Sequence, residues 1–303
     1  MRSVAFVCPI YDSRNHFDYG INLLKSKIEN DIDSDLYFIF SDDEQRIKFE
    51  KITVNNKIVD EFRYLILPTE EGKYKSQVTI KKFFGLKCLK DKYKYLATID
   101  SESKFIQKMD YFFVFNEMWK NGEMLKSNKS PNGFFIMRTC FKTLGVYDNK
   151  VLKKETDNYL YNVWFNDIPL YKCELLDEFF QWLDLQKQDY KIEWMCFEYY
   201  IFTAFLIIKK GYHLKKYDIE SLGGIMEYLY VFSEDEQIRI IESMTPHWTS
   251  SNKCINENTG IMFHLDRDVN DETYNSSTFF EDIKKYKWWR RKRIIKDFIG
   301  WDK

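Results

Sequence analysis

Short apolar runs alternate with segments of helical periodicity over the first hundred residues. Polar or turn-forming residues bound each run, as is typical of buried strands. The runs cover residues 4–10, 35–40, 62–67 and 95–99. Residues 16–29 and 79–90 carry apolar side chains three and four positions apart, the spacing of a helix that packs on one face. The alternation predicts an α/β domain with a mostly parallel central sheet flanked by helices.

The second half of the chain lacks this regular alternation. Residues 133–140 form a strand-like run after a turn at residues 129–132, and residues 260–266 form another such run. Residues 175–185 and 193–209 are rich in aromatic side chains and are expected to be helices. Their aromatic stripes indicate a packed core rather than a platform for a ligand.

Composition bounds the size and organisation of the domain. The chain has 303 residues, of which 45% are hydrophobic and 18% aromatic, so it can bury a sizeable core and is not disordered over most of its length. With 11 Gly and 5 Pro it has few natural boundaries, and we predict one compact domain of two fused halves. The halves would be residues 1–125 and 126–275, and residues 276–303 would form a helical C-terminal elaboration.

The charge and the cysteines of the chain limit the kinds of partner and the cellular compartment that we expect. The net charge is −1, from 46 basic and 47 acidic residues, so we expect no nucleic-acid partner. The first apolar stretch breaks at Pro9, too early for a signal peptide or a membrane span, which favours a cytoplasmic protein. The six cysteines are scattered without zinc spacing, and the four within apolar segments fit small buried side chains rather than a disulfide framework, so we expect a reducing compartment.

Polar clusters follow three of the predicted strands. They are Tyr11-Asp12, Ser41-Asp42-Asp43 and Asp100-Ser101-Glu102. Ligands of parallel sheets bind at the carboxyl ends of the strands, and two carboxylates there could hold a divalent cation against the phosphates of a nucleotide. Asp42 or Asp43 could hold the base or ribose, although capping of the next helix alone explains them somewhat better. A plain turn is the alternative for the acidic triplet.

This order of elements, with an acidic triplet after the fourth strand, resembles the GT-A class of nucleotide-sugar glycosyltransferases, whose sheet is Rossmann-like. In that class an Asp-X-Asp motif binds the metal ion and the diphosphate. The resemblance implies that Asp100 and Glu102 bind Mn²⁺ or Mg²⁺ and that Ser101 lies at the nucleotide. The third position is Glu here, which leaves open which carboxylate contacts the metal.

More narrowly, residues 1–270 are similar to bacterial polysaccharide-locus transferases of the capsule and O-antigen kind. The similarity rests on residues 7–12, 79–86 and 197–200. It implies that Pro9 and Tyr11 line the nucleotide site. Lys81 or Lys82 could lie over the phosphates, because ammonium groups serve as point charges for phosphate. A solvated helix face is the alternative for these adjacent lysines.

The resemblance also implies a histidine ligand and a general base. His264 would complete the metal shell, His247 is a competing candidate, and a core histidine is the alternative; imidazole suits Mn²⁺ better than Mg²⁺. Glu198 is the preferred base for the acceptor hydroxyl and Glu193 the second candidate, since both lie among aromatic residues where an unpaired carboxylate is costly. A salt bridge to a lysine is the alternative for Glu198.

The segment 286–301 combines a basic cluster with Trp, Ile and Phe. This composition suits a helix at the surface of an anionic membrane, although the aromatic side could also pack on the domain. We therefore expect a metal-assisted glycosyltransferase that moves a sugar from a nucleotide donor, most simply a UDP-sugar, to a bacterial surface polysaccharide or a lipid-linked glycan. The alternatives are a nucleotidyltransferase, which would usually have a Gly-rich loop after its first strand, and a non-catalytic carbohydrate-binding protein.

Overall fold

The computed structural model describes most of residues 2–216 and the short segment 262–264. The gaps in the first range are residues 13–15, 59–60, 75–76, 102, 106–107, 109, 121–125, 128–130, 162 and 164–168. His247 and the predicted C-terminal elaboration, residues 276–303, lie outside the described residues.

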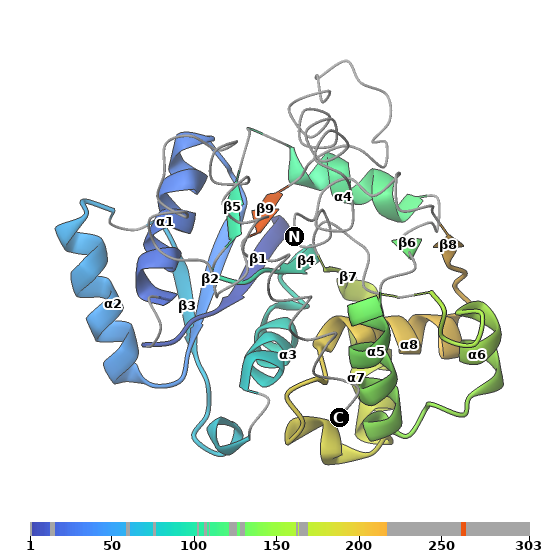
Figure 1. Ribbon diagram of the computed structural model, residues 1–303. Coiled ribbons are helices and arrows are strands. Elements are labelled where there is room, and N and C mark those ends of the chain that lie inside the picture. Colours follow the sequence, from blue (N-terminus) through green and yellow to red (C-terminus); the bar gives the residue numbers. More distant parts are fainter. Residues whose placement is uncertain are drawn as a thin grey trace.

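A five-stranded sheet forms the centre of the domain, with the strand order β3-β2-β1-β4-β7 (Figure 1). The strands are β1 (Arg2–Pro9), β2 (Asp35–Phe40), β3 (Arg63–Ile66), β4 (Tyr93–Thr98) and β7 (Leu170–Lys172). The first four are parallel to one another, and β7 pairs antiparallel with β4. Four of these strands lie within one to two residues of the apolar runs in the sequence, so the prediction of a mostly parallel α/β sheet is confirmed.

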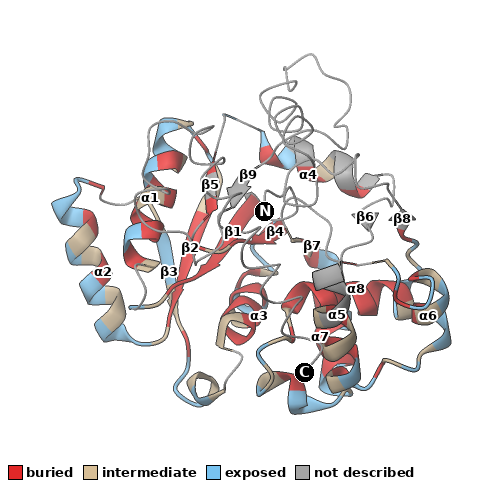
Figure 2. Ribbon diagram, viewed as in Figure 1, coloured by how far each residue is buried: buried red, intermediate tan, exposed pale blue. Residues whose placement is uncertain are grey.

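Helices cover both faces of the sheet. Side chains alternate along β1, so its apolar residues point to both faces and each face needs a covering layer. Phe6 packs edge-on against Tyr111 at the start of α4 (Tyr111–Lys120) and against Phe105 of β5 (Ser103–Phe105). The next residue, Val7, meets Gly85 of α3 (Gln77–Leu89) on the opposite face. Figure 2 shows the resulting distribution, with buried residues along β1, β2 and β4 and exposed ones on the outer sides of the helices.

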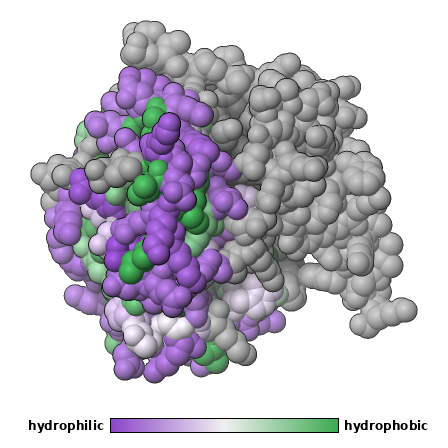
Figure 3. Space-filling model, turned by 90° about the vertical axis from the view of Figure 1, so that its left-hand side faces the viewer, coloured by the Kyte–Doolittle hydropathy of each residue, from purple (hydrophilic) through white to green (hydrophobic). Residues whose placement is uncertain are grey.

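Two further helices lie beside the β2 side of the sheet, namely α1 (His16–Glu29) and α2 (Asp43–Asn55). Phe49 of α2 packs against Phe17 of α1 and against Phe38 of β2, and these contacts hold the two helices together beside β2. Figure 3 shows that the surface of this end of the molecule is mostly hydrophilic, with separate hydrophobic spots.

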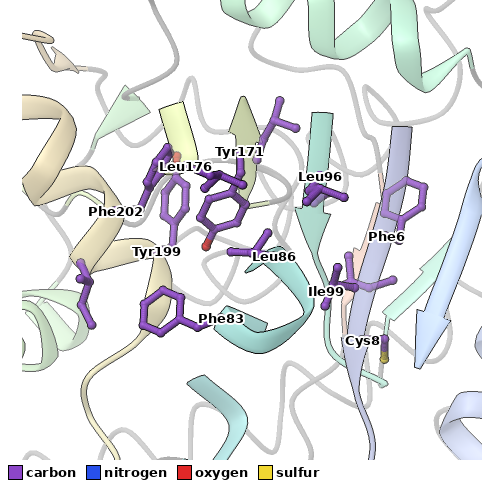
Figure 4. Packing of buried hydrophobic residues seen from close by; sticks show 14 of the residues in the cluster. Phe6, Cys8, Phe83, Leu86, Leu96, Ile99, Tyr171, Leu176, Tyr199 and Phe202 are labelled. Atoms are coloured by element: carbon purple, nitrogen blue, oxygen red, sulfur yellow. The ribbon is translucent and has the colours of Figure 1, made fainter. Parts of the chain in front are cut away.

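A mainly helical layer continues the core beyond β7. It consists of α5 (Pro131–Leu144), α6 (Lys150–Glu155), α7 (Leu176–Asp184) and α8 (Glu198–Lys210), with short 3-10 turns at Cys173–Leu175 and Gln188–Lys191. A third 3-10 turn, Glu71–Lys73, lies between β3 and α3. The ring of Tyr171 on β7 lies 4.8 Å from that of Phe202 on α8. Figure 4 shows these two rings in the same group of buried side chains as Leu86 of α3 and Leu96 of β4. The left-handed Gly211 (φ 68°) ends α8.

Two predictions for this layer are wrong. Residues 133–140 belong to helix α5 and not to a strand; the buried Met137, Cys140, Phe141 and Leu144 recur at helical spacing, and Pro131 occupies the first helical position. The helix predicted over residues 193–209 begins only at Glu198, because the preceding residues form a turn with the bond Cys196 N to Glu193 O (3.2 Å).

Two short strand pairs complete the described structure. In one, β5 pairs antiparallel with β9 (Met262–His264), and Figure 1 shows the two side by side. In the other, β6 (Lys126–Ser127) pairs with β8 (Lys215–Lys216). Within the described chain no helix combines the length and apolar character needed to cross a membrane. The described cysteines other than the exposed Cys88 are buried, as predicted; they are Cys8, Cys140, Cys173 and Cys196.

Candidate functional site

The three polar clusters meet at one edge of the sheet. Strands β2, β1 and β4 are neighbours and run in the same direction, so the segments that follow them emerge side by side. Backbone bonds continue the pairing past the strands, with Ile10 N to Ile39 O at 3.2 Å and Ile99 N to Val7 O at 3.0 Å. Pro9 is the buried last residue of β1, and Tyr11 is half-buried just beyond it. This is the edge at which parallel sheets bind their ligands.

Asp100, the first residue of the acidic triplet, is held by a buried lysine. The Lys82 Nζ lies 2.9 Å from Oδ1 of Asp100 and 3.1 Å from Oε1 of Glu198. The side chain of Lys82 is 2% exposed and that of Glu198 is 0% exposed, whereas Asp100 is 36% exposed and reaches the surface of the edge. The contacts join α3, the end of β4 and the start of α8.

The charges in this network support one another. Burial alone would lower the pKa of Lys82, but Asp100 and Glu198 outweigh it and raise that pKa, so the ammonium stays protonated. Glu198 is the first residue of α8, where the helix dipole favours a negative charge. Its Oε1 also accepts a hydrogen bond from Thr98 Oγ1 (2.9 Å). Burial and the charge of Glu198 both raise the pKa of the neighbouring Tyr171 hydroxyl.

Glu198 therefore does not lie in the cleft position that its aromatic surroundings suggested. Its carboxylate is enclosed in the core, and the salt bridge to Lys82 considered as its alternative is present in the structure. Glu193 is half-buried in the turn before α8, and its Oε1 accepts from the backbone N–H of Met195 (3.5 Å).

Lys81 is buried as completely as Lys82, but its ammonium points toward the segment that follows β1 rather than toward Asp100. Its Nζ donates to the carbonyl oxygen of Ile10 (2.6 Å) and lies 3.7 Å from the centre of the Tyr11 ring. Burial lowers the pKa of Lys81 to about 7, although Asp42 and the Cys8 thiol oppose this shift. The solvated helix face considered for these two lysines is thus excluded, since both ammonium groups lie inside at the edge of the sheet.

His16 is a residue at this edge that the sequence does not single out. It is the first residue of α1, and its Nδ1 lies 2.8 Å from Oγ of Ser101 in the acidic triplet. The imidazole also contacts the rings of Tyr11 (5.8 Å) and Tyr19 (6.1 Å) edge-on. Its only signal in the sequence is its position at the start of the helix that follows the first strand.

Asp42 and Asp43 behave as capping residues. Asp42 is the N-cap of α2 and its Oδ1 accepts from Gln45 N (2.8 Å). Asp43 accepts from Arg46 Nε (2.7 Å) on the surface. The capping interpretation is therefore present in the structure, while a contact of either residue with a base or ribose stays a prediction.

The backbone brings His264 close to the acidic triplet. Strand β9 pairs with β5 so that His264 lies opposite Ser103, three positions after Asp100. Glu102 lies outside the described residues, as does the side chain of His264. In the described part of the chain, no three His, Cys, Asp or Glu side chains gather as a metal site would require. The chemistry of the predicted donor set, two carboxylates and an imidazole, fits Mn²⁺.

Comparisons with known proteins find distant likenesses only. No family model matches the chain, and no curated protein does. Among solved structures, the galactosyltransferase LgtC, in complex with donor and acceptor sugar analogs, is 11% identical with a TM-score of 0.45 and covers 94% of this chain and 95% of its own. Mouse xyloside xylosyltransferase 1, in its apo form, is 8% identical with a TM-score of 0.41 and covers 87% and 97%. Likenesses at this level establish neither a common fold nor a common activity.

Proposed function

We propose that this protein is a GT-A-type glycosyltransferase that takes its sugar from a nucleotide-linked donor. The observation that carries the proposal is the Asp100–Lys82 pair at the carboxyl edge of a parallel sheet. A second buried lysine, Lys81, reaches the same edge at the end of β1. A carboxylate that can ligate a metal ion, with ammonium groups at the same edge that can face phosphate oxygens, suits a metal-bound diphosphate.

Asp100, Glu102 and His264 would hold Mn²⁺ or Mg²⁺, and the strand pair β5–β9 supports the inclusion of His264. The ion would supply positive charge that stabilises the departing nucleoside diphosphate. Lys82 orients the Asp100 carboxylate, and Lys81 lies against the face of the Tyr11 ring, which would line the nucleotide site. Pro9 and Ser101 would shape the floor of this site, with Asp42 or Asp43 near the base or ribose.

The finer assignments follow the resemblance to polysaccharide-locus transferases. We place UDP in the donor, and a bacterial surface polysaccharide or a lipid-linked glycan as the acceptor. Glu193 takes the role of general base in this proposal, because Glu198 is enclosed. Residues 286–301 would contact an anionic membrane from the cytoplasmic side, and the nearly neutral charge of the chain argues against a nucleic-acid partner.

Nucleotide binding tests the proposal most directly. Thermal shift and calorimetry with UDP, GDP and CMP, each with and without Mn²⁺, should show metal-dependent stabilisation by UDP. Asp100→Asn should remove most of it. Asp177→Asn is the matched control, because Asp177 also pairs with a lysine (Lys90, 2.8 Å) but lies on the exposed face of α7.

Stabilisation of wild type and Asp100→Asn to the same extent would show that the site is wrongly placed. If no nucleotide stabilised the wild type at all, the proposal would be refuted in favour of a non-catalytic carbohydrate-binding protein. Binding of a nucleoside triphosphate together with a sugar phosphate would favour a nucleotidyltransferase.

A further inference from the structure

Glu198 is a buried charge that the proposed reaction does not use directly. It is fully enclosed, yet it is ionisable and sits where the helix dipole stabilises its charged form. Its Oε2 has no hydrogen-bond partner among the described residues, so the core contains an incompletely paired carboxylate. Such groups are rare in native structures and call for an explanation.

Stability is a poor explanation for this arrangement. The desolvation of two buried charges offsets most of their attraction, and apolar residues of the same size are often equally stabilising. Three charged groups at the junction of α3, β4 and α8 therefore contribute little net stability that Leu or Met could not supply. What an ion pair provides instead is a defined geometry.

That geometry runs from Glu198 to Asp100 through one ammonium group. The Lys82 side chain is long and flexible, and on its own it could present Nζ to Asp100 from several directions. Glu198 Oε1 restricts it, because Nζ must lie within 3.1 Å of that atom while it contacts Asp100 Oδ1 at 2.9 Å. Thr98 Oγ1 donates to the same oxygen at 2.9 Å and holds the Glu198 carboxylate against β4.

We infer that Glu198 is a positioning residue, which orients Lys82 and through it the Asp100 carboxylate that faces the ligand edge of the sheet. This inference rests on the proposed function for its consequence, namely that the nucleotide is bound tightly only while the network is intact. It assigns Glu198 no contact with donor or acceptor.

The test uses graded substitutions in the full chain. Glu198→Leu removes the acceptor and should raise the Kd for UDP with Mn²⁺ at least tenfold. Glu198→Gln keeps an acceptor of the same length for Lys82 and Thr98, so it should raise the Kd only about threefold. Glu178→Gln is the control, because Glu178 pairs with Lys210 (2.9 Å) on the exposed side of α7 and should bind as wild type does.

The double variant Lys82→Met/Glu198→Leu separates positioning from stability. It removes both buried charges, so it should unfold at a temperature equal to or above that of Glu198→Leu while its affinity stays low. Wild-type affinity in the double variant, or in Glu198→Leu, would overturn the inference.

A crystal structure of Glu198→Leu decides the case even if wild type binds no nucleotide and the proposed function fails. Loss of the Nζ–Oδ1 contact between Lys82 and Asp100 would support positioning by Glu198. A contact unchanged at 2.9 Å would refute it. If Glu198→Leu does not fold, the structure of Glu198→Gln answers the same question, with alternate positions of the Lys82 ammonium as the supporting result and a single unchanged position as the opposing one.

Discussion

Replacing Lys81 by Met should make the protein less sensitive to pH between neutrality and pH 9. In the folded protein the Lys81 ammonium is enclosed at the edge of the sheet, and burial lowers its pKa to about 7 from the ordinary 10.5. Asp42 after β2 and Cys8 of β1 oppose this shift without cancelling it. Met has a similar length and no charge, so it removes the titration while it retains much of the packing.

The sign follows from proton binding in the two states. Between pH 7 and 10.5 the unfolded chain keeps the Lys81 proton that the folded chain has released, so the free energy of unfolding rises with pH over this interval. Below pH 7 the full penalty for burial applies, about 5 kcal/mol for this shift. From pH 7 to pH 9 wild type should recover about 2 kcal/mol of it, and Lys81→Met should not.

Urea denaturation at the two pH values measures this difference. The stability of Lys81→Met minus that of wild type should fall by about 2 kcal/mol from pH 7 to pH 9, and other titrating groups cancel in the subtraction. Lys87→Met, on the exposed side of the same helix, should change stability by the same small amount at both pH values. A difference for Lys81→Met that stays constant within about 0.5 kcal/mol would refute burial of this ammonium.

Two further predictions concern packing. Gly85→Ala should lower the free energy of unfolding, measured in urea, by about 1–3 kcal/mol, because its Cβ would lie 2.5 Å from Cγ1 of the stiff Val7 side chain. Gly72→Ala is the control and should be nearly neutral, because its Cβ meets no atom within 4 Å. Equal effects of the two substitutions would contradict the close packing of α3 on the sheet. Iodoacetamide should modify Cys88 in the native protein and the four buried thiols only after unfolding, as judged by peptide mass spectrometry; native modification of a buried thiol would count against the described core.

The regular part of the fold could be predicted because its signals are local. Helix α1 and strand β2 have the bounds that the pattern of the sequence predicts, since periodicity and capping act within a few residues. The prediction of a strand over residues 133–140 was wrong because it relied on the same local signals. A run of eight mostly apolar residues fits a buried strand or one side of a buried helix, and only the packing of α5 on α8 and its neighbours decides between them.

The sequence by itself indicated that the polar clusters share one edge, because strands that alternate with helices pair in parallel and parallel strands end on the same side. The structure confirms the parallel pairing and supplies the strand order. It could not determine what happens to charged side chains between layers. Lys81 and Lys82 are adjacent on a helix, about 100° apart. Because α3 contacts both the sheet and α8, the Lys81 ammonium donates to Ile10 just beyond β1, while that of Lys82 meets Asp100 and Glu198. Tertiary packing alone makes them buried, because the segment after β1, 71 residues away from Lys81, and the start of α8 enclose them.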